Sequence, residues 1–332
     1  MKKRFLAVLL AAVMTLSIAP AASADTGGAK KLKSGDKFTE RLTTDMPGVK
    51  FETSFNMVFV EGGTFTLGWE APDVTMRPAD VAPVRNVTVS DFYIGETEVT
   101  VEMWNAVMGL NKPGADAKRP KENVNFYQVQ EFLSRLYVLT GRTYRLATEA
   151  EWEFAAKGGN PGKTGNAQYP GNNHEYLFAG SNNHDEVVAS RTSVADVKTK
   201  KPNILGIYDM SGNAEEWVYD TWNTTHIGGV DPIGPGGHIH QQKVRRGGTY
   251  GTNSADSTRT LAARQIRSID GAAGMGFRIA LSGDMNSVPP GMVRPRDVKH
   301  PHIDERALPV TYRDARWITN DDSLWLGTFA GT

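Results

Sequence analysis

The sequence predicts a domain of mixed α-helices and β-strands in which long stretches have no regular secondary structure. Short runs of alternating apolar residues predict strands, and apolar residues at helical spacing predict a few helices. Between about residues 160 and 245 the chain is rich in Gly, Asn and Pro. Irregular segments of this length are usually functional, or need ligands to satisfy their backbone groups.

The chain begins with the features of a secretory signal peptide. Residues 2–4 are basic, residues 5–20 are mainly apolar, and Ala22-Ser23-Ala24 is a small-residue cleavage site. A membrane anchor is the alternative, but this apolar stretch is short for a span and ends in small residues. We therefore expect a signal peptide over residues 1–24 and a soluble mature protein, exported to the periplasm or out of the cell. No later stretch predicts an integral membrane protein.

Charge and cysteine content restrict the possible partners and chemistry. Removing the three basic residues of the signal peptide from the chain's 37 leaves 34, against 37 acidic residues, a net charge of −3. This balance argues against nucleic acid or an anionic membrane as the main partner. The chain has no Cys, so its mature form cannot use the disulfides that exported proteins often contain.

The first elements are strands that follow a polar segment. Residues 25–50 contain several Lys and Gly residues and are expected to form a flexible leader. The domain is expected over residues 51–282. It opens with a strand at 57–60, a Gly-Gly turn and a strand at 64–67, and residues 84–93 alternate as another strand.

Three helices have clear start signals. Thr100 is a suitable N-cap for a short helix, and a longer helix follows Asn125 and ends at Gly141. Thr148 and Glu151 form a capping box at the start of the third helix. Residues 243–250 and 274–281 are expected to form strands that close the domain.

The tail over residues 283–332 has a different composition. Its first part is rich in Pro and predicts a stiff connector. Residues 310–319 and 324–329 then suggest a hairpin. Its aromatic side chains need cover, so we expect the hairpin to dock on the domain.

Seven stretches together resemble the formylglycine-generating-enzyme, or sulfatase-modifying-factor, family, and they occur in the family's order between about residues 55 and 282. The resemblance implies an α+β fold, a variant of the C-type-lectin-like fold with little regular secondary structure. Neither the leader nor the tail is covered. The stretches are Met57–Gly68 (MVFVEGGTFTLG), Phe92–Gly109 (FYIGETEVTVEMWNAVMG), Thr140–Gly159 (TGRTYRLATEAEWEFAAKGG), Asn203–Trp217 (NILGIYDMSGNAEEW), Arg246–Tyr250 (RGGTY), Ala262–Arg264 (AAR) and Gly276–Arg278 (GFR).

The turn from Asp209 to Glu216 is a candidate calcium site. Two carboxylates and backbone carbonyls held by a tight loop suit this hard cation. The resemblance implies ligands at Asp209, at the carbonyls of Gly212 and Ala214, and at Glu216, with Asp209 in place of the usual Asn. A plain turn in which Glu216 pairs with an Arg is the alternative.

The resemblance also implies a second calcium site, with a looser match. It falls near Asn182, Asn183 and Asp185.

The family's oxidation chemistry is excluded by the missing cysteines. In catalytic relatives two Cys thiolates in this region bind Cu(I) and activate oxygen, which converts a sulfatase Cys to formylglycine. Here the first position is Thr252 and the second falls at Asp256 or Ser257. Hydroxyl and carboxylate oxygens are poor Cu(I) ligands, so no copper is expected.

The substrate groove of the family is the remaining candidate cleft. Thr249 and Arg264 match groove positions, and Tyr250, Thr252 and Asp256 lie close to them in sequence. Arg264 could hold a carboxylate or a peptide carbonyl, or form a structural ion pair. Arg278 is expected to be structural, because its guanidinium would tie loops together in the closing core.

Two functions remain open from the sequence. The first is a non-catalytic, calcium-stabilised binding or scaffold module for a peptide, glycan or protein. The second is an enzyme of different chemistry, acting in the maturation of a peptide or small molecule at the cleft around Thr252 and Arg264.

Overall fold

The computed structural model describes residues 31–46, 49–69, 83–189, 192–234, 242–250, 264–269, 271 and 273–295. Apart from Lys31, they belong to one compact unit, Leu32–Thr332. The predicted signal peptide and the predicted hairpin at 310–329 lie outside the described residues. None of the described helices has the length and apolar character needed to cross a bilayer.

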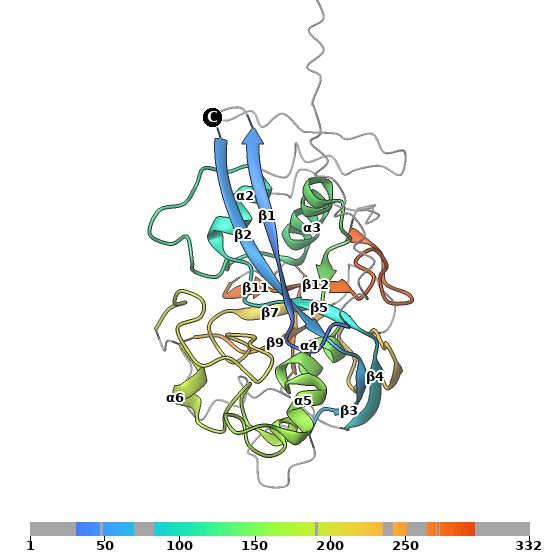
Figure 1. Ribbon diagram of the computed structural model, residues 1–332. Coiled ribbons are helices and arrows are strands. Elements are labelled where there is room, and N and C mark those ends of the chain that lie inside the picture. The colour runs from blue at the N-terminus through green and yellow to red at the C-terminus, as the bar shows by residue number, and fades with distance from the viewer. Residues whose placement is uncertain are drawn as a thin grey trace, which may run out of the picture. The chain divides into compact units, whose positions relative to one another are not determined.

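The largest sheet is antiparallel and joins the two ends of the domain (Figure 1). Its strand order is β1-β2-β5-β12-β6. Strand β12, the last strand of the domain, lies inside this sheet because it pairs with β5 on one side and with β6 on the other. The strands are β1 (Lys37–Met46), β2 (Val49–Val60), β5 (Phe92–Gly95), β6 (Arg145–Leu146) and β12 (Ile279–Ser282).

Two smaller sheets complete the described β-structure. One has the order β10-β9-β7-β11, in which β11 runs parallel to β7, and the other has the order β3-β4-β8. The strands are β3 (Gly63–Leu67), β4 (Arg85–Val89), β7 (Glu215–Thr221), β8 (Gly229–Val230), β9 (Lys243–Arg246), β10 (Arg264–Arg267) and β11 (Met275–Phe277).

The three predicted helices begin where their caps predict. Helix α2 (Val101–Met108) starts at the Thr100 N-cap, and α3 (Phe126–Thr140) ends at Gly141 in the left-handed conformation. Helix α4 (Glu149–Ala156) has the capping box of Thr148 and Glu151. Mixed helices and sheets of this kind confirm the α+β fold class.

Three short elements in the irregular region were not predicted: α5 (Gly159–Thr164), η1 (Asn173–Glu175) and α6 (His184–Val187). Helix α5 contains glycines that ordinarily weaken a helix. Close packing requires one of them, because a Cβ at Gly162 would lie 2.1 Å from the carbonyl oxygen of Lys157.

The prediction of a flexible leader over residues 25–50 is wrong for β1. The strand pairs with β2 from Lys37 to Met46 without a register shift. Its inward side chains are held by the domain: Phe38 packs on Tyr93 with ring centroids 5.2 Å apart, and Leu42 is only 3 % exposed. The Lys and Gly residues that predicted a flexible leader lie mostly before β1, and inside the strand a charged residue, Glu40, occupies an inward position.

Glu40 is accommodated by two partners from the segment after α3. Arg142 Nε donates to its carboxylate at 2.8 Å, and the Tyr144 hydroxyl donates to the same oxygen at 2.9 Å. Because of these bonds, Glu40 can face inward like Phe38 and Leu42, and β1 continues past it without interruption.

The first part of the Pro-rich connector packs on the domain. Met292 is buried in the core, and the backbone N–H of Val293 donates to the Tyr219 hydroxyl at 2.9 Å.

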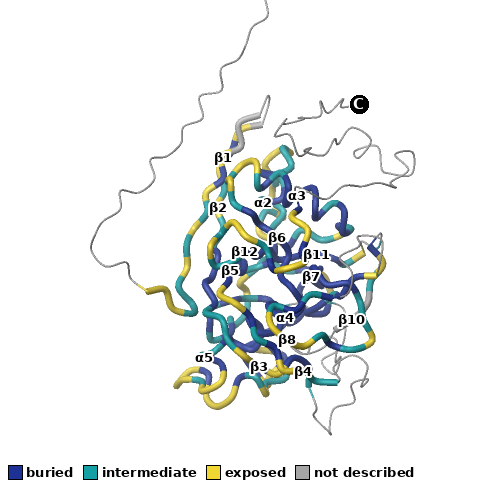
Figure 2. The backbone as a smooth tube through the Cα atoms, turned by 90° about the vertical axis from the view of Figure 1, so that its right-hand side faces the viewer, coloured by how far each residue is buried: buried dark blue, intermediate teal, exposed yellow. Residues whose placement is uncertain are grey.

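The buried residues concentrate around α4, β7 and β11 (Figure 2). On one side, Trp104 of α2 stacks on Phe132 of α3 with centroids 5.3 Å apart. On the other, Trp152 and Phe154 of α4 pack with the strands β3 and β4. Strand β7 contributes Trp217 to the first of these hydrophobic clusters and Val218 to the second. The turn that precedes β7 therefore lies between the two clusters.

Replacing Leu42 tests whether β1 is part of the folded domain. Leu42→Ala removes a buried side chain and should lower the free energy of unfolding by about 2–5 kcal/mol. Thr43→Ala, at an exposed position of the same strand, should change it by less than about 0.5 kcal/mol. Chemical denaturation measures both, and equal, small effects would show that the strand is dispensable.

Candidate functional site

A buried ion pair holds the turn that precedes β7. Arg278 and Glu216 are each 1 % exposed or less. Arg278 Nη2 donates to Glu216 Oε1 at 2.8 Å, and Trp152 Nε1 donates to Glu216 Oε2 at 2.7 Å. Both oxygens of the Glu216 carboxylate are therefore occupied by protein donors.

Arg278 Nε also donates to the Glu216 carboxylate at 3.2 Å, and two further N–H groups of Arg278 bind backbone carbonyls. Its Nη1 donates to the carbonyl of Gly95 at 2.8 Å, and its Nη2 donates to that of Tyr208, also at 2.8 Å. One guanidinium thus ties the end of β5 to the loop before Asp209 and to β7. This is the structural role that the sequence suggests for Arg278.

The turn itself has an unusual backbone. Asp209, Gly212 and Asn213 all have positive φ, at 59°, 84° and 61°. Such values are strained for residues other than Gly and persist only where the surroundings impose them. The Asn213 side chain contributes, because its Oδ1 accepts the backbone N–H of Ala195 at 2.9 Å.

Two carboxylate oxygens near this turn are buried without a hydrogen-bond donor. Asp209 Oδ2 accepts the N–H of Lys198 at 2.8 Å, and Glu98 Oε1 accepts that of Ala214 at 3.3 Å. Within the described part of the chain, Asp209 Oδ1 and Glu98 Oε2 have no such partner. Burying a polar atom in this way is costly unless a proton or a cation compensates.

The electrostatics of these two acids reflect that cost. Burial, followed by the neighbouring charge of Asp209, raises the pKa of Glu98 well above its usual value. Burial likewise raises the pKa of Asp209 to about 6. Arg278 lowers both, but it cannot neutralise them because its N–H groups are directed to Glu216 and to carbonyls.

The predicted calcium ligands fit a hard cation only in part. Asp209 offers a free oxygen, whereas Glu216 is engaged in the ion pair that the sequence left open as the alternative. Glu98 supplies a second free carboxylate oxygen, and the sequence analysis missed it. The only signal for Glu98 in the sequence was its position beside Val99, just before the helix that begins after Thr100. Over the described ranges, no group of three or more His, Cys, Asp or Glu is arranged to hold a metal.

The residues of the second predicted calcium site stabilise local turns. Asn182 Oδ1 accepts the N–H of Leu177 at 2.8 Å, and Asn183 caps α6 by accepting the N–H of Asp185. The Asp185 side chain is 72 % exposed and contacts His184 Nδ1 at 3.0 Å. A cation at this site stays a prediction.

The predicted cleft is described only at its margin. Thr252, Asp256 and Ser257 lie outside the described residues, and for Arg264 the structure gives only backbone pairing with Arg246. The N–H of Tyr250 donates to the carbonyl of Asn213 at 3.0 Å, so Tyr250 and its neighbour Thr249 adjoin the Asp209–Glu216 turn.

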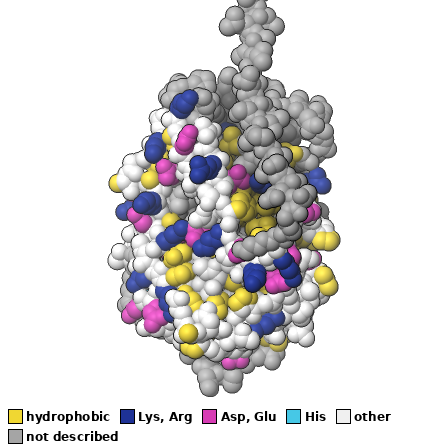
Figure 3. Space-filling view, viewed as in Figure 1, with side chains coloured by type: hydrophobic (Ala, Val, Ile, Leu, Met, Phe, Trp, Pro, Cys, Tyr) yellow, Lys and Arg dark blue, Asp and Glu magenta, His cyan; other side chains and the backbone are white. Residues whose placement is uncertain are grey.

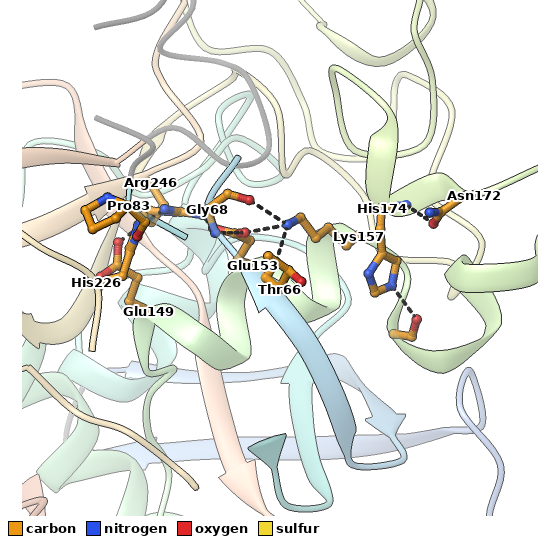
Figure 4. A network of polar contacts seen from close by, with 11 residues as sticks. Thr66, Gly68, Pro83, Glu149, Glu153, Lys157, Asn172, His174, His226 and Arg246 are labelled. Atoms are coloured by element: carbon orange, nitrogen blue, oxygen red, sulfur yellow. Dashed lines mark hydrogen bonds and ion pairs between the residues drawn. The ribbon is translucent and has the colours of Figure 1, made fainter. Parts of the chain in front are cut away.

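A second buried ionic network supports this margin from α4 (Figure 4). Arg246 pairs with Glu153 and with Glu149, and its guanidinium lies 5.1 Å from the Trp152 ring centroid. Lys157 Nζ approaches Glu153 to 2.7 Å. Burial alone would raise the pKa of Glu153, but Lys157 and Arg246 hold it at about 2.

The same network reaches β3 through backbone groups. Lys157 Nζ donates to the carbonyls of Thr66 and Gly68, and Glu153 accepts the N–H of Gly68 at 2.8 Å. Nearby, His174 Nε2 contacts the carbonyl oxygen of Gly159 at 2.8 Å, and burial lowers its pKa to about 4. Lys157, Glu153 and His174 all bind other protein groups. Through the bonds of Lys157 and Glu153, the backbone of Thr66 and Gly68 is held against α4.

Comparison with known proteins identifies the domain. Residues 43–282 match the model of the family described as the sulfatase-modifying factor enzyme 1-like domain. The chain belongs to this family. The match ends where the predicted domain ends and begins inside β1, eight residues before the predicted start.

Individual relatives of this sulfatase-modifying factor family differ in their named roles. The chain is 32 % identical over 217 residues to "Chaperone protein LppX" of Paenibacillus barcinonensis, covering 52 % of this chain and 73 % of that protein. It is 35 % identical over 153 residues to the formylglycine-generating enzyme of Streptomyces coelicolor, covering 43 % of this chain and 48 % of the enzyme. The aligned part thus spans about half the length of that enzyme.

A solved structure supports the fold. Treponema denticola variable protein 1 superposes with a TM-score of 0.56 at 26 % identity, over 73 % of this chain and 98 % of that one. The fold inferred from the seven sequence motifs is therefore confirmed.

Removing one member of the buried ion pair should be severe. Arg278→Met leaves the Glu216 carboxylate buried without its cation and should lower the free energy of unfolding by about 3–5 kcal/mol. Arg119→Met breaks an exposed pair with Asp116 and should cost less than about 1 kcal/mol. Adding Glu216→Gln to Arg278→Met should recover part of the loss, and a double variant less stable than Arg278→Met would contradict this account.

Proposed function

We propose that this chain is a non-catalytic member of the sulfatase-modifying factor family that is exported and binds polypeptides. The absence of Cys from the whole sequence carries the proposal. In catalytic relatives Cys thiolates hold Cu(I), and at the matching positions this chain has Thr252 and Asp256 or Ser257, whose oxygens are poor ligands for this soft ion. The chain thus lacks the Cys residues that the family's oxidation uses, while it keeps the family's fold.

A polypeptide ligand is supported by the LppX relative. That protein is named a chaperone, and the alignment covers 73 % of its length. Export is supported by the basic and apolar start of the sequence. A domain built on fixed ionic networks suits a binding role, because a rigid surface loses little conformational entropy when it binds.

Calcium is proposed as a stabilising ion at the Asp209 turn. Asp209 and the carbonyls of Gly212 and Ala214 would hold it, and the free oxygen of Glu98 makes that residue a better second carboxylate than Glu216. A divalent cation bound there would compensate two buried negative charges and fix a turn with three left-handed residues.

The binding function has a direct test. The mature chain should bind reduced, carboxymethylated α-lactalbumin, a protein that cannot fold, and should not bind native α-lactalbumin. The same preparation, given copper, oxygen and a sulfatase peptide, should leave the Cys of that peptide unchanged. Mass spectrometry reads the peptide and fluorescence anisotropy reads the binding. Formylglycine in the peptide would overturn the non-catalytic proposal, and equal affinity for both forms of α-lactalbumin would overturn polypeptide binding.

Calcium removal should lower the melting temperature of the mature chain. An ion that binds only the native state at about one hundred times its Kd contributes roughly 2.7 kcal/mol. Asp209→Ala and Glu98→Gln should each reduce the response to chelator, while Asp116→Ala at the surface should retain it. Melting curves that do not change on chelation in the unsubstituted protein would remove calcium from the proposal.

A further inference from the structure

Among the described strands, none pairs with the outer edge of the hairpin β1–β2. Strand β1 is the terminal strand of its sheet and, within the residues that the structure covers, pairs with β2 alone. Pairing continues over all ten residues of β1 without a bulge. Figure 1 shows the hairpin projecting past α2 and α3.

The hydrogen bonds of β2 show which residues of β1 face that edge. The carbonyl of Asn56 accepts the N–H of Glu96, so the backbone of Asn56 points toward β5 and away from β1. Thr39, opposite Asn56, is then a non-hydrogen-bonded partner whose N–H and C=O point outward. Alternation places the backbone groups of Lys37, Arg41, Thr43 and Asp45 on the same edge.

The middle of the edge has few of the features that usually protect such strands. Natural edge strands are short, bulged or interrupted by Pro, or carry charged side chains, especially Lys, and charges that point inward. The segment from Phe38 to Thr43 has no Pro or Gly, and its one inward charge, Glu40, is paired with Arg142. Lys37 and Asp45 face the edge at its two ends, and among the three edge-facing residues between them, Thr39, Arg41 and Thr43, only Arg41 is charged.

The strand is also held rigidly in position. Its inward side chains are anchored by the Phe38–Tyr93 ring contact, by the bonds to Glu40, and by the burial of Leu42. An incoming strand would therefore meet a preformed template and would not have to order it.

We propose that this edge of β1 binds an extended segment of another polypeptide, which adds to the sheet as a sixth strand. This inference rests on the proposed polypeptide binding and names its site. The backbone groups of Thr39, Arg41 and Thr43 are complementary to an extended backbone, and to no compact ligand. Basic and acidic side chains are interspersed over the face shown in Figure 3, so this face has no broad electrostatic potential of one sign that would favour an acidic or a basic partner. The local charge of Arg41 favours a segment with an acidic residue directly opposite.

Amide hydrogen exchange on the mature chain tests the site. In the free protein, the N–H groups of Thr39, Arg41 and Thr43 should exchange faster than those of Glu40 and Leu42, which bond to β2. Addition of reduced, carboxymethylated α-lactalbumin should slow exchange at the three outward positions.

Two substitutions of Arg41, to Pro and to Ala, form a matched pair that tests the outward N–H of this residue. Arg41→Pro removes an outward N–H without removing a bond to β2, and should raise the Kd for the probe by about tenfold or more. Arg41→Ala keeps the N–H and should change the Kd by less than about threefold. Melting curves of both variants show whether the fold is retained. If Arg41→Pro does not fold, exchange at the outward amides of Arg41→Ala, which keeps every backbone donor, decides the question.

The outcomes separate the two proposals. Binding of the probe with protection elsewhere, or with an unchanged Kd for a folded Arg41→Pro variant, would overturn the β1 site and leave polypeptide binding intact. No binding of the probe would overturn both. Protection of the edge without probe, rising with protein concentration and with the sedimenting mass, would identify a second copy of this chain as the occupant and overturn the assignment to a different polypeptide.

Discussion

The Arg278–Glu216 ion pair is the contact on which the rest of the domain depends. It is fully buried, and its guanidinium also binds the carbonyls of Gly95 and Tyr208. A chain without disulfides and with long irregular loops has few ladder hydrogen bonds to fix those loops. A planar guanidinium with five donors can satisfy several loop carbonyls at once, and its charge is tolerated because the carboxylate that faces it also accepts from Trp152.

That use of Arg278 leaves an electrostatic imbalance nearby. Three buried carboxylates, at Glu98, Asp209 and Glu216, lie near one guanidinium, and two of their oxygens have no donor in the described part of the chain. At the α4 network the balance is different, because Glu153 faces both Lys157 and Arg246 and its pKa falls to about 2. One network is satisfied by protein charges, whereas the other needs a proton or a cation, which is why we propose the Asp209 turn as the place where calcium would bind.

The parts of the structure that the sequence predicted depend on neighbours in the chain. Thr100, Asn125 and Thr148 start helices through bonds to residues three positions away, so their pattern is visible in the sequence. The parts that were missed depend on distant partners. Glu40 can face inward only because Arg142 and Tyr144 meet it, and the partner of Glu216 lies 62 residues further along the chain. Glu98 was missed for the same reason, since its burial follows from packing against the Asp209 turn.

The arrangement also explains how the family's fold can form in a chain that has no Cys. The resemblance to the catalytic relatives places the thiolate positions at Thr252 and at Asp256 or Ser257, between β9 and β10 in the sequence. The two buried networks draw their charged groups from elsewhere: Glu149, Glu153 and Lys157 from α4 and its C-cap, Glu216 from β7, Arg246 from β9, and Arg278. Substitution at the thiolate positions removes none of these charges. The buried networks therefore do not draw on the thiolate positions, and a member without that chemistry, as we propose this chain to be, would keep rigid surfaces such as the edge of β1.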